Sequence, residues 1–228
     1  MNKRAIVSES AATAKAAGAS GAAGAQRAPT PLVGATFETG AVAVAQLPTD
    51  GAAEIAFAGR SNSGKSSAIN ALARQTRLAY ASRTPGRTQM INFFRLRSGA
   101  RIADLPGYGY AAVPRALKKD WQDFLWVYVT TRTSLVGLVL VVDARHGLRT
   151  MDEQLLGGFL PSGRPVLILA TKIDKLNQAE RRAAVASIAS RLTEVFPEHA
   201  PAVSVVAFSV PSRLGIEQAD AAIAPWIS

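Results

Sequence analysis

One segment limits the folds open to this chain more than any other feature. Its eight residues, Gly-Arg-Ser-Asn-Ser-Gly-Lys-Ser at positions 59–66, follow the apolar run Ile55 to Ala58. The glycines at 59 and 64 permit backbone conformations that turn successive N–H groups toward an anion, and a helix that starts near Gly64 adds its positive dipole end. The pattern therefore predicts a phosphate-binding loop between a strand and a helix, with a bound nucleoside triphosphate.

Two side chains of this loop have roles that require their chemistry. Lys65 is placed to reach the outer phosphates and to offset charge in the transition state, and the Ser66 hydroxyl is placed to ligate the accompanying Mg²⁺. We expect nucleotide contacts along the whole loop, from Gly59, Arg60, Ser61, Asn62, Ser63, Gly64, Lys65, Ser66 and Ser67. A glycine- and serine-rich turn is the alternative interpretation.

A second motif suits a sensor of the terminal phosphate. Asp104-Leu105-Pro106-Gly107 follows the strand-like run Ala100 to Ala103. The carboxylate of Asp104 can be directed at Mg²⁺ through water, and the N–H of Gly107 can meet the terminal phosphate.

A third motif indicates which base is bound. Thr171-Lys172-Ile173-Asp174 follows the apolar run Val166 to Ala170, so Asp174 is expected at a strand end. Its carboxylate can accept two hydrogen bonds from N1–H and the exocyclic amine of guanine, whereas adenine offers no such pair of donors. The motif therefore predicts GTP rather than ATP, with the Lys172 stem across the base; a surface Lys/Asp loop is the alternative.

Length and periodicity predict one α/β domain. The chain has 228 residues, 48% of them hydrophobic, which is enough for one sizeable core. Strand-like and helix-like segments alternate from Phe37 onward, as in a mostly parallel sheet, here of six strands, with helices on both faces. The strand candidates are Glu54 to Ala58, Ile91 to Leu96, Ala100 to Leu105, Leu135 to Asp143, Val166 to Thr171 and Val203 to Ser209. The helix candidates are Lys65 to Arg74, Arg115 to Thr131, Thr150 to Leu160, Gln178 to Phe196 and Ile216 to Ile227.

The first 35 residues differ from the rest of the chain. They are rich in Ala, Gly and Ser and lack aromatic residues, so we expect residues 1–35 to be a disordered tail and residues 36–228 to form the domain. Glu9 and Lys15 interrupt what would have to be the apolar core of a signal peptide. An organelle transit peptide and a bacterial extension both remain open.

Charge and composition point to the kind of partner. The sequence has 26 Lys and Arg against 16 Asp and Glu, a net charge of +10, which favours a polyanionic partner such as RNA, with an anionic membrane face as second choice. No cysteine and only two histidines are present, so neither disulfides nor a usual zinc site is expected. The longest apolar run, Leu135 to Val142, is far short of the roughly 20 residues that span a bilayer, and we expect a soluble protein.

The segment from Ile55 to Ala103 contains no acidic residue. Its cations are Arg60, Lys65, Arg74, Arg77, Arg83, Arg87, Arg95, Arg97 and Arg101. The segment includes the loop Ala79 to Gln89, where Thr88 is our candidate for a second Mg²⁺ ligand and catalytic residue. If that loop closes on the terminal phosphate, its arginines are presented in only one nucleotide state. Solvated faces of a helix and a hairpin are the alternative for about half of these arginines, and an arginine finger in cis is a lesser one for Arg83 or Arg87.

Aromatic residues after the second motif raise two further questions. Tyr108 stands where efficient signalling GTPases have a water-orienting glutamine, so intrinsic hydrolysis is expected to be slow; alternatively Tyr108 only packs and another group positions water. Trp121 and Trp126 could stack on RNA bases, but their spacing and their neighbours Phe124 and Leu125 favour core packing.

Together the motifs carry a family resemblance. Residues 59–67, Thr84-Pro85-Gly86-Arg87-Thr88-Gln89, residues 104–110 and Thr171-Lys172-Ile173-Asp174 resemble the EngB (YihA/YsxC) family of bacterial GTP-binding proteins. The resemblance runs from about Phe37 to the C-terminus. It implies a Ras-like P-loop G domain, a role in maturing the large ribosomal subunit, and the bacterial cytoplasm, while plant organelle relatives keep a transit peptide open.

The resemblance also implies roles residue by residue. Phosphate contacts come from Asn62 to Ser66, Mg²⁺ ligation from Ser66 and Thr88, phosphate sensing from Asp104 and Gly107, and guanine recognition from Thr171, Lys172 and Asp174. Thr171 stands where many GTPases have asparagine, which removes one loop-bracing amide. A last guanine element would be Phe208-Ser209-Val210, with backbone donation by Val210, although Pro211 follows it. Asn62 matches a potassium-binding asparagine, so K⁺ is a further candidate cofactor.

These observations predict a slow GTPase that binds Mg²⁺ and GTP or GDP and assists assembly of the large ribosomal subunit. It would bind rRNA or ribosomal protein in a nucleotide-dependent way, as a cytoplasmic monomer with no membrane partner. Two alternatives stay open: a signalling or cell-division GTPase acting on protein partners, and a non-hydrolysing RNA-binding module that holds GTP as a structural ligand.

Overall fold

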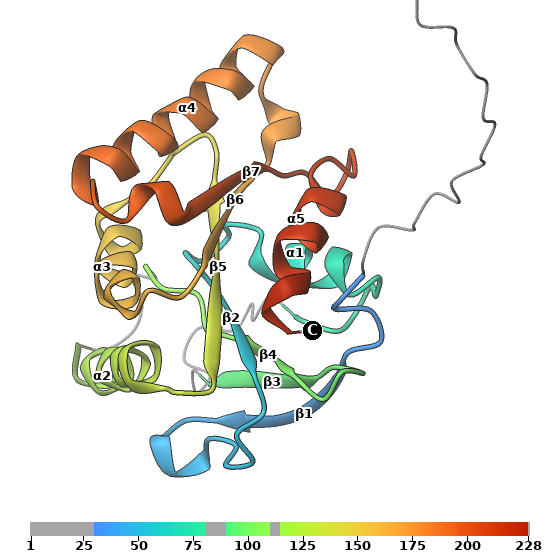
Figure 1. The fold of residues 1–228 in the computed structure, drawn as a ribbon, viewed down its shortest axis with the longest axis vertical. Coiled ribbons are helices and arrows are strands. Elements are labelled where there is room, and N and C mark those ends of the chain that lie inside the picture. Colours follow the sequence, from blue (N-terminus) through green and yellow to red (C-terminus); the bar gives the residue numbers. More distant parts are fainter. Residues whose placement is uncertain (1–29, 81–89, 110–114, 228) are drawn as a thin grey trace, which may run out of the picture.

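The computed structural model describes residues 30–80, 90–109 and 115–227 (Figure 1). Within them a seven-stranded sheet has the order β1-β3-β4-β2-β5-β6-β7. The strands are β1 (Thr36–Ala41), β2 (Glu54–Gly59), β3 (Ile91–Arg95), β4 (Arg101–Asp104), β5 (Leu135–Asp143), β6 (Val166–Thr171) and β7 (Val203–Ala207). β3 runs antiparallel to β1 and β4, and all other neighbours are parallel.

Five α-helices connect these strands in the described parts of the chain. They are α1 (Lys65–Leu72), α2 (Arg115–Thr131), α3 (Thr150–Phe159), α4 (Gln178–Val195) and α5 (Ile216–Ile223). Short 3₁₀ turns are formed by Val44–Gln46, Leu160–Ser162, Ile173–Lys175, Ala200–Ala202 and Ala224–Trp226. α2, α3 and α4 cover one face of the sheet, and α1 and α5 cover the other (Figure 1).

The core is divided by the sheet into two layers. Successive residues of a strand point to opposite faces, so Ala56 and Ala58 of β2 pack with α2, α3 and α4, whereas Ile55 and Phe57 pack with α1 and α5. Residues 138–142 of β5 are buried on both faces, which explains why the sequence shows an apolar run there rather than an alternation.

The predicted fold class is confirmed, but the strand count is seven rather than six. The missed strand, β1, lies at the sheet edge, and its first three residues are exposed. A bulge between Phe37 and Thr39 also interrupts its pairing with β3. An edge strand of this kind has no clear period of two, because only part of one face is buried.

The folded domain begins earlier than residue 36. Thr30 to Ala35, which the composition places in the tail, form a turn in which Leu32 and Ala35 are fully buried beside Phe94 and Leu96. The apolar side chain of Leu32 belongs to the core layer that α1 and α5 cover. The remainder of the tail, residues 1–29, lies outside the described residues.

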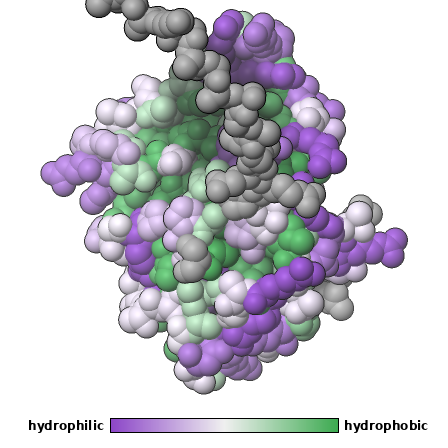
Figure 2. Space-filling view, turned by 45° about the vertical axis from the view of Figure 1, so that its right-hand side comes forward, coloured by the Kyte–Doolittle hydropathy of each residue, from purple (hydrophilic) through white to green (hydrophobic). Residues whose placement is uncertain are grey.

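The five predicted helices are present with small differences at their ends. α1 ends at Leu72 rather than Arg74, and Arg74 has a left-handed backbone with φ of 56°. None of the helices in the described ranges has both the length and the apolar composition needed to cross a membrane. On the face shown in Figure 2, hydrophobic surface near the middle is surrounded by hydrophilic side chains.

Candidate nucleotide-binding site

The predicted phosphate loop connects the end of β2 to the start of α1. Gly59 is required there, because a Cβ at this position would lie 2.5 Å from the backbone oxygen of Val141 and 2.7 Å from Ser63 Oγ. Asn62 takes a left-handed backbone with φ of 64°, which asparagine tolerates better than most residues. The loop turns tightly against β5, where the N–H groups of Ser61 and Ser63 donate to the backbone oxygens of Tyr108 and Arg60 at 2.9 and 3.0 Å. The start of α1, directly after the loop, suits an anion.

Lys65 and Asp104 form an ion pair at the centre of this site. Their side chains are only 10% and 6% exposed. They come together because β2 and β4 are parallel neighbours, with Phe57 beside Asp104 in the register. Phosphate oxygens can replace Asp104 as the partner of Lys65, and Mg²⁺ with its waters can replace Lys65 as the partner of Asp104. The two groups therefore fit a Mg²⁺–triphosphate.

The remaining residues of the predicted phosphate site differ in how exposed their side chains are. Ser66 is partly exposed in the first turn of α1, and Ser67 next to it is exposed. Ser63 is buried, and its hydroxyl has no hydrogen-bond partner among the described residues. Thr88, the expected second Mg²⁺ ligand, lies outside the described residues, as do Arg83 and Arg87.

Thr171 braces the phosphate loop from the end of β6. Its hydroxyl donates to the backbone oxygen of Ser63 at 2.5 Å and lies 3.0 Å from that of Val142. A threonine was expected to lack the bracing amide found in many GTPases at this position. The hydroxyl supplies the brace instead, because the side chain is buried and points into the loop.

Lys172 connects the same two loops. Its ammonium group donates to the backbone oxygen of Asn62 at 2.6 Å and pairs with the Asp143 carboxylate at 3.0 Å. Arg145 also pairs with Asp143, through Nε at 2.9 Å and Nη2 at 2.7 Å. Burial alone would raise the pKa of Asp143, but hydrogen bonds from Arg145 and Lys172 hold it well below its usual range. The charged carboxylate fixes the Lys172 stem.

Asp174 is oriented by a residue of the last predicted guanine element. The Ser209 hydroxyl donates to Asp174 Oδ1 at 2.8 Å, and this bond lowers the pKa of Asp174. Ser209 is buried, and its N–H donates to the backbone oxygen of Leu214 at 3.0 Å. The carboxylate that is to read guanine is thus ionised and held in one direction.

The other two residues of that element have unequal positions. Val210 is partly buried, directly after Ser209, which contacts Asp174. Residues 172–175, which follow β6 and include Asp174, are the predicted base-reading loop. The Phe208 side chain is fully buried in the layer with α1 and α5, so it cannot contact a nucleotide as predicted. Its backbone oxygen accepts from the N–H of Ile173 at 3.4 Å, which supports the loop that carries Asp174.

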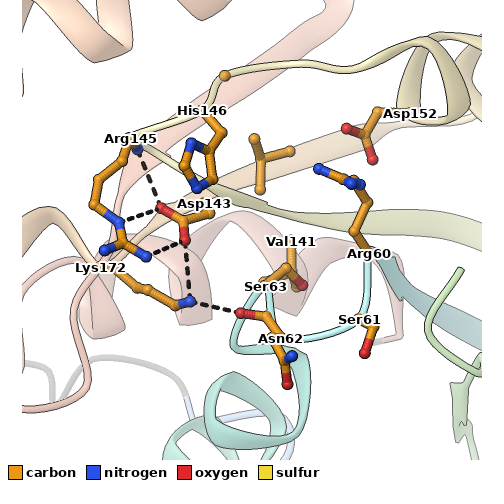
Figure 3. A pocket seen from close by; sticks show the side chains of 12 residues that line it. Arg60, Ser61, Asn62, Ser63, Val141, Asp143, Arg145, His146, Asp152 and Lys172 are labelled. Atoms are coloured by element: carbon orange, nitrogen blue, oxygen red, sulfur yellow. Dashed lines mark hydrogen bonds and ion pairs between the residues drawn. The ribbon is translucent and has the colours of Figure 1, made fainter. Parts of the chain in front are cut away.

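A hollow of about 250 Å³ adjoins the phosphate loop (Figure 3). Its charged lining comes from four segments, namely the phosphate loop, the end of β5, the start of α3 and the base-reading loop. The residues that carry charge are Arg60, Asp143, Arg145, Asp152 and Lys172. The sequence analysis missed Asp143, Arg145 and Asp152. A signal was available for Asp143 and Arg145, which lie at the end of β5 and just after it, because ligands of open α/β sheets bind where strands end. Asp152 lies further along, in the first turn of α3.

Several cations of the acid-free segment are neutralised by carboxylates from outside it. Arg101 is buried and donates to both Glu38 and Asp50, which also pair with Arg95. Arg74 donates to the buried Asp220 at 3.0 Å. The charge of these arginines is therefore paired, although Arg74 is itself exposed, whereas no ion pair within the described residues is found for the exposed Arg77 and Arg97.

The aromatic residues are only partly placed as expected. The Tyr108 hydroxyl donates to Asp152 Oδ1 at 2.6 Å, and Tyr108 packs against the core layer that α2, α3 and α4 cover. Core packing is wrong for Trp126, which is 50% exposed. Its ring lies over Gly158, whose missing Cβ brings α2 and α3 together and leaves the ring on their surface. The Trp121 side chain lies outside the described residues.

Known proteins are similar to this chain over most of its length. A family model described as "50S ribosome-binding GTPase" matches residues 54–172. The chain is 48% identical over 193 residues to "Probable GTP-binding protein EngB" of Azoarcus sp. (strain BH72), covering 85% of this chain and 91% of the relative. It is 46% identical over 194 residues to the protein of the same name from Idiomarina loihiensis, covering 85% and 92%.

Among solved structures, similarity is found to "Crystal structure of a probable GTP-binding protein engB". The TM-score is 0.60 at 22% identity, covering 77% of this chain and 98% of that one. At this identity the structural likeness supports the fold.

Proposed function

The chain belongs to the EngB family of GTP-binding proteins, and on this premise we propose that it is a GTPase that assists assembly of the large ribosomal subunit. The observation that carries the proposal is the convergence of the phosphate loop and the Ser209–Asp174 pair at one edge of the sheet. The family model's description, "50S ribosome-binding GTPase", supplies the partner.

Hydrolysis would depend on positioning and charge. Lys65 would bind the outer phosphates, and Ser66, Thr88 and Asp104 would hold Mg²⁺. The metal, when bound, neutralises charge that develops on the β- and γ-phosphate oxygens. Gly107 would donate its N–H to the terminal phosphate, and Asp174 would select guanine.

A low intrinsic rate is part of the proposal. The support comes from Tyr108, which stands where efficient signalling GTPases have a water-orienting glutamine and whose hydroxyl is engaged by Asp152. Fast hydrolysis would then require a water-orienting group supplied by the ribosomal partner.

Potassium is proposed as an accessory cation near the phosphates. The support is Asn62, whose left-handed backbone places it at the turn of the phosphate loop. We expect GTP hydrolysis to be faster in potassium chloride than in sodium chloride. Equal rates would contradict the proposed potassium site.

The ribosomal partner is proposed from charge as well as from family. A net charge of +10 suits an RNA-rich surface, and exposed arginines such as Arg77 and Arg97 are candidates for phosphate contacts. We further propose a monomer in the bacterial cytoplasm, since the relatives named above are bacterial.

The test is co-sedimentation with purified large subunits in the presence of a non-hydrolysable GTP analogue, GDP or no nucleotide. Association only with the analogue is expected. An Asp174→Asn variant provides the matched control. It should bind the large subunit in the presence of a xanthosine triphosphate analogue, and should not bind it in the presence of the GTP analogue. Absence of association in every state would favour a signalling or cell-division GTPase. Equal association in all three nucleotide states, with no turnover of GTP, would favour an RNA-binding module.

A further inference from the structure

Asp152 is a buried carboxylate that the proposed nucleotide chemistry leaves unused. It lies in the first turn of α3 and is 2% exposed. Its Oδ2 accepts the backbone N–H of Arg149 at 2.9 Å, which closes the start of α3, and its Oδ1 accepts the Tyr108 hydroxyl at 2.6 Å. One side chain therefore joins α3 to the segment directly after the phosphate sensor.

The main chain of Tyr108 is held to the phosphate loop on its other side. The N–H of Ser61 donates to the backbone oxygen of Tyr108 at 2.9 Å, and the N–H of Tyr108 lies 3.4 Å from the backbone oxygen of Gly59. The preceding residue, Gly107, is in close contact with the same loop, because a Cβ there would lie 3.1 Å from the Cα of Ser61. The position of Gly107 is thus set by two attachments of its neighbour Tyr108.

The direction of the side-chain hydrogen bond is fixed by burial and charge. Burial and the charge of Asp152 raise the pKa of the Tyr108 hydroxyl well above its usual value, so the hydroxyl keeps its proton and donates. Burial raises the pKa of Asp152, and the hydrogen bonds from Tyr108 and the Arg149 N–H oppose this rise. Arg60, which lines the same hollow and points toward Asp152 (Figure 3), opposes it as well. Both carboxylate oxygens accept hydrogen bonds, as an ionised carboxylate does. The contact is therefore a charge-assisted hydrogen bond.

We infer that Asp152 is a positioning residue for the phosphate sensor: by holding Tyr108 to the start of α3, it sets the place of the Gly107 N–H and increases the preference for GTP over GDP. The inference rests on the proposed function. Only GTP has a terminal phosphate for Gly107 to meet, so loss of the contact should weaken triphosphate binding and leave diphosphate binding nearly unchanged. A purely structural role for Asp152 would weaken both nucleotides alike.

The experiment compares affinities for a non-hydrolysable GTP analogue and for GDP, both with Mg²⁺, by calorimetry on the full chain. Tyr108→Phe removes only the hydroxyl and leaves the Asp152–Arg149 contact that closes α3. We expect analogue affinity to fall about fivefold with GDP affinity within about twofold of the parent. Asp152→Ala removes the acceptor of the same hydrogen bond, together with the Arg149 contact at the start of α3, and should lower the ratio of analogue to GDP affinity by about the same factor. The double variant should lower that ratio no further than either single one, because both remove the same interaction.

Tyr128→Phe is the matched control. It removes another buried tyrosine–carboxylate hydrogen bond, from Tyr128 to Glu54 at 2.8 Å, far from the phosphate sensor. This variant should lower stability without changing the ratio of analogue to GDP affinity. An unchanged ratio in a folded Tyr108→Phe protein, or additive effects in the double variant, would overturn the inference. If the parent protein binds neither nucleotide, the proposed function fails instead.

Discussion

The ammonium group of Lys172 donates to the backbone oxygen of Asn62, which ties the base-reading loop to the phosphate loop. The same ammonium group pairs with Asp143 at the end of β5. Three strand ends, those of β2, β5 and β6, therefore meet at one cation. Nucleotide binding at either loop should depend on contacts made at the other.

Asp143→Asn removes the carboxylate that holds Lys172. We expect GDP and GTP to dissociate about tenfold faster, because a charged partner of a partly buried ammonium group is lost. Stopped-flow release of a fluorescent guanine nucleotide measures this rate. Arg145→Met is the control, since it removes the more exposed partner of Asp143 and should change the rate by no more than about twofold. Equal effects of the two substitutions would contradict the assignment.

Thr171→Val tests the brace between β6 and the phosphate loop. Valine keeps the shape of threonine but cannot donate to the Ser63 oxygen, so GDP affinity should fall about fivefold. Thr171→Ser retains the hydroxyl and should bind nearly as well as the parent. Titration calorimetry distinguishes the two, and identical affinities for all three proteins would show that the hydroxyl is not a brace.

Asp174→Asn tests base recognition. The variant should lose about a hundredfold in GTP affinity and gain preference for xanthine nucleotides, because an amide offers guanine one acceptor but suits the xanthine carbonyl. Ser209→Ala serves as a comparison. It removes the bond that orients Asp174, so it should weaken GTP binding modestly without changing the preferred base. Unaltered GTP affinity in Asp174→Asn would refute the assignment.

Asp220 makes stability depend on pH. Its side chain is fully buried in α5, and burial raises its pKa to about 6, against the opposing effect of its partner Arg74. The folded state therefore binds the proton more tightly than the unfolded state does, and the free energy of unfolding should fall as pH rises through 6. The loss between pH 5 and pH 7.5 should be about 1.4 kcal/mol from this group.

Asp220→Asn provides the comparison for this prediction. The amide does not titrate, so urea unfolding should show the variant gaining stability relative to the parent by that amount as pH rises from 5 to 7.5. In Arg74→Met, the guanidinium that lowers the pKa of Asp220 is absent. The decrease in the free energy of unfolding should therefore occur at higher pH than in the parent. A constant difference between parent and Asp220→Asn at all pH values would contradict the shifted pKa.

The strong sequence signals concern contiguous segments with demanding chemistry. The phosphate loop, the buried runs of β5 and β6, and Asp174 all lie where the pattern places them. The pattern of β1 was too weak to identify, since its first three residues are exposed and its pairing with β3 is interrupted. Residue type and spacing determine a turn or a buried strand locally, whereas an edge strand depends on a neighbour far away in the sequence.

By itself, the sequence determined the order of the helices and of the other six strands, the phosphate loop, and the place of Asp174 just after β6, because each depends on neighbouring residues. Only the tertiary structure decided which distant groups meet there. β5 lies between β2 and β6, with Asp143 opposite Thr171, so Asp143 reaches Lys172; α3 begins beside the phosphate sensor, so Asp152 reaches Tyr108. Such pairs follow from strand order and register, which no single segment encodes.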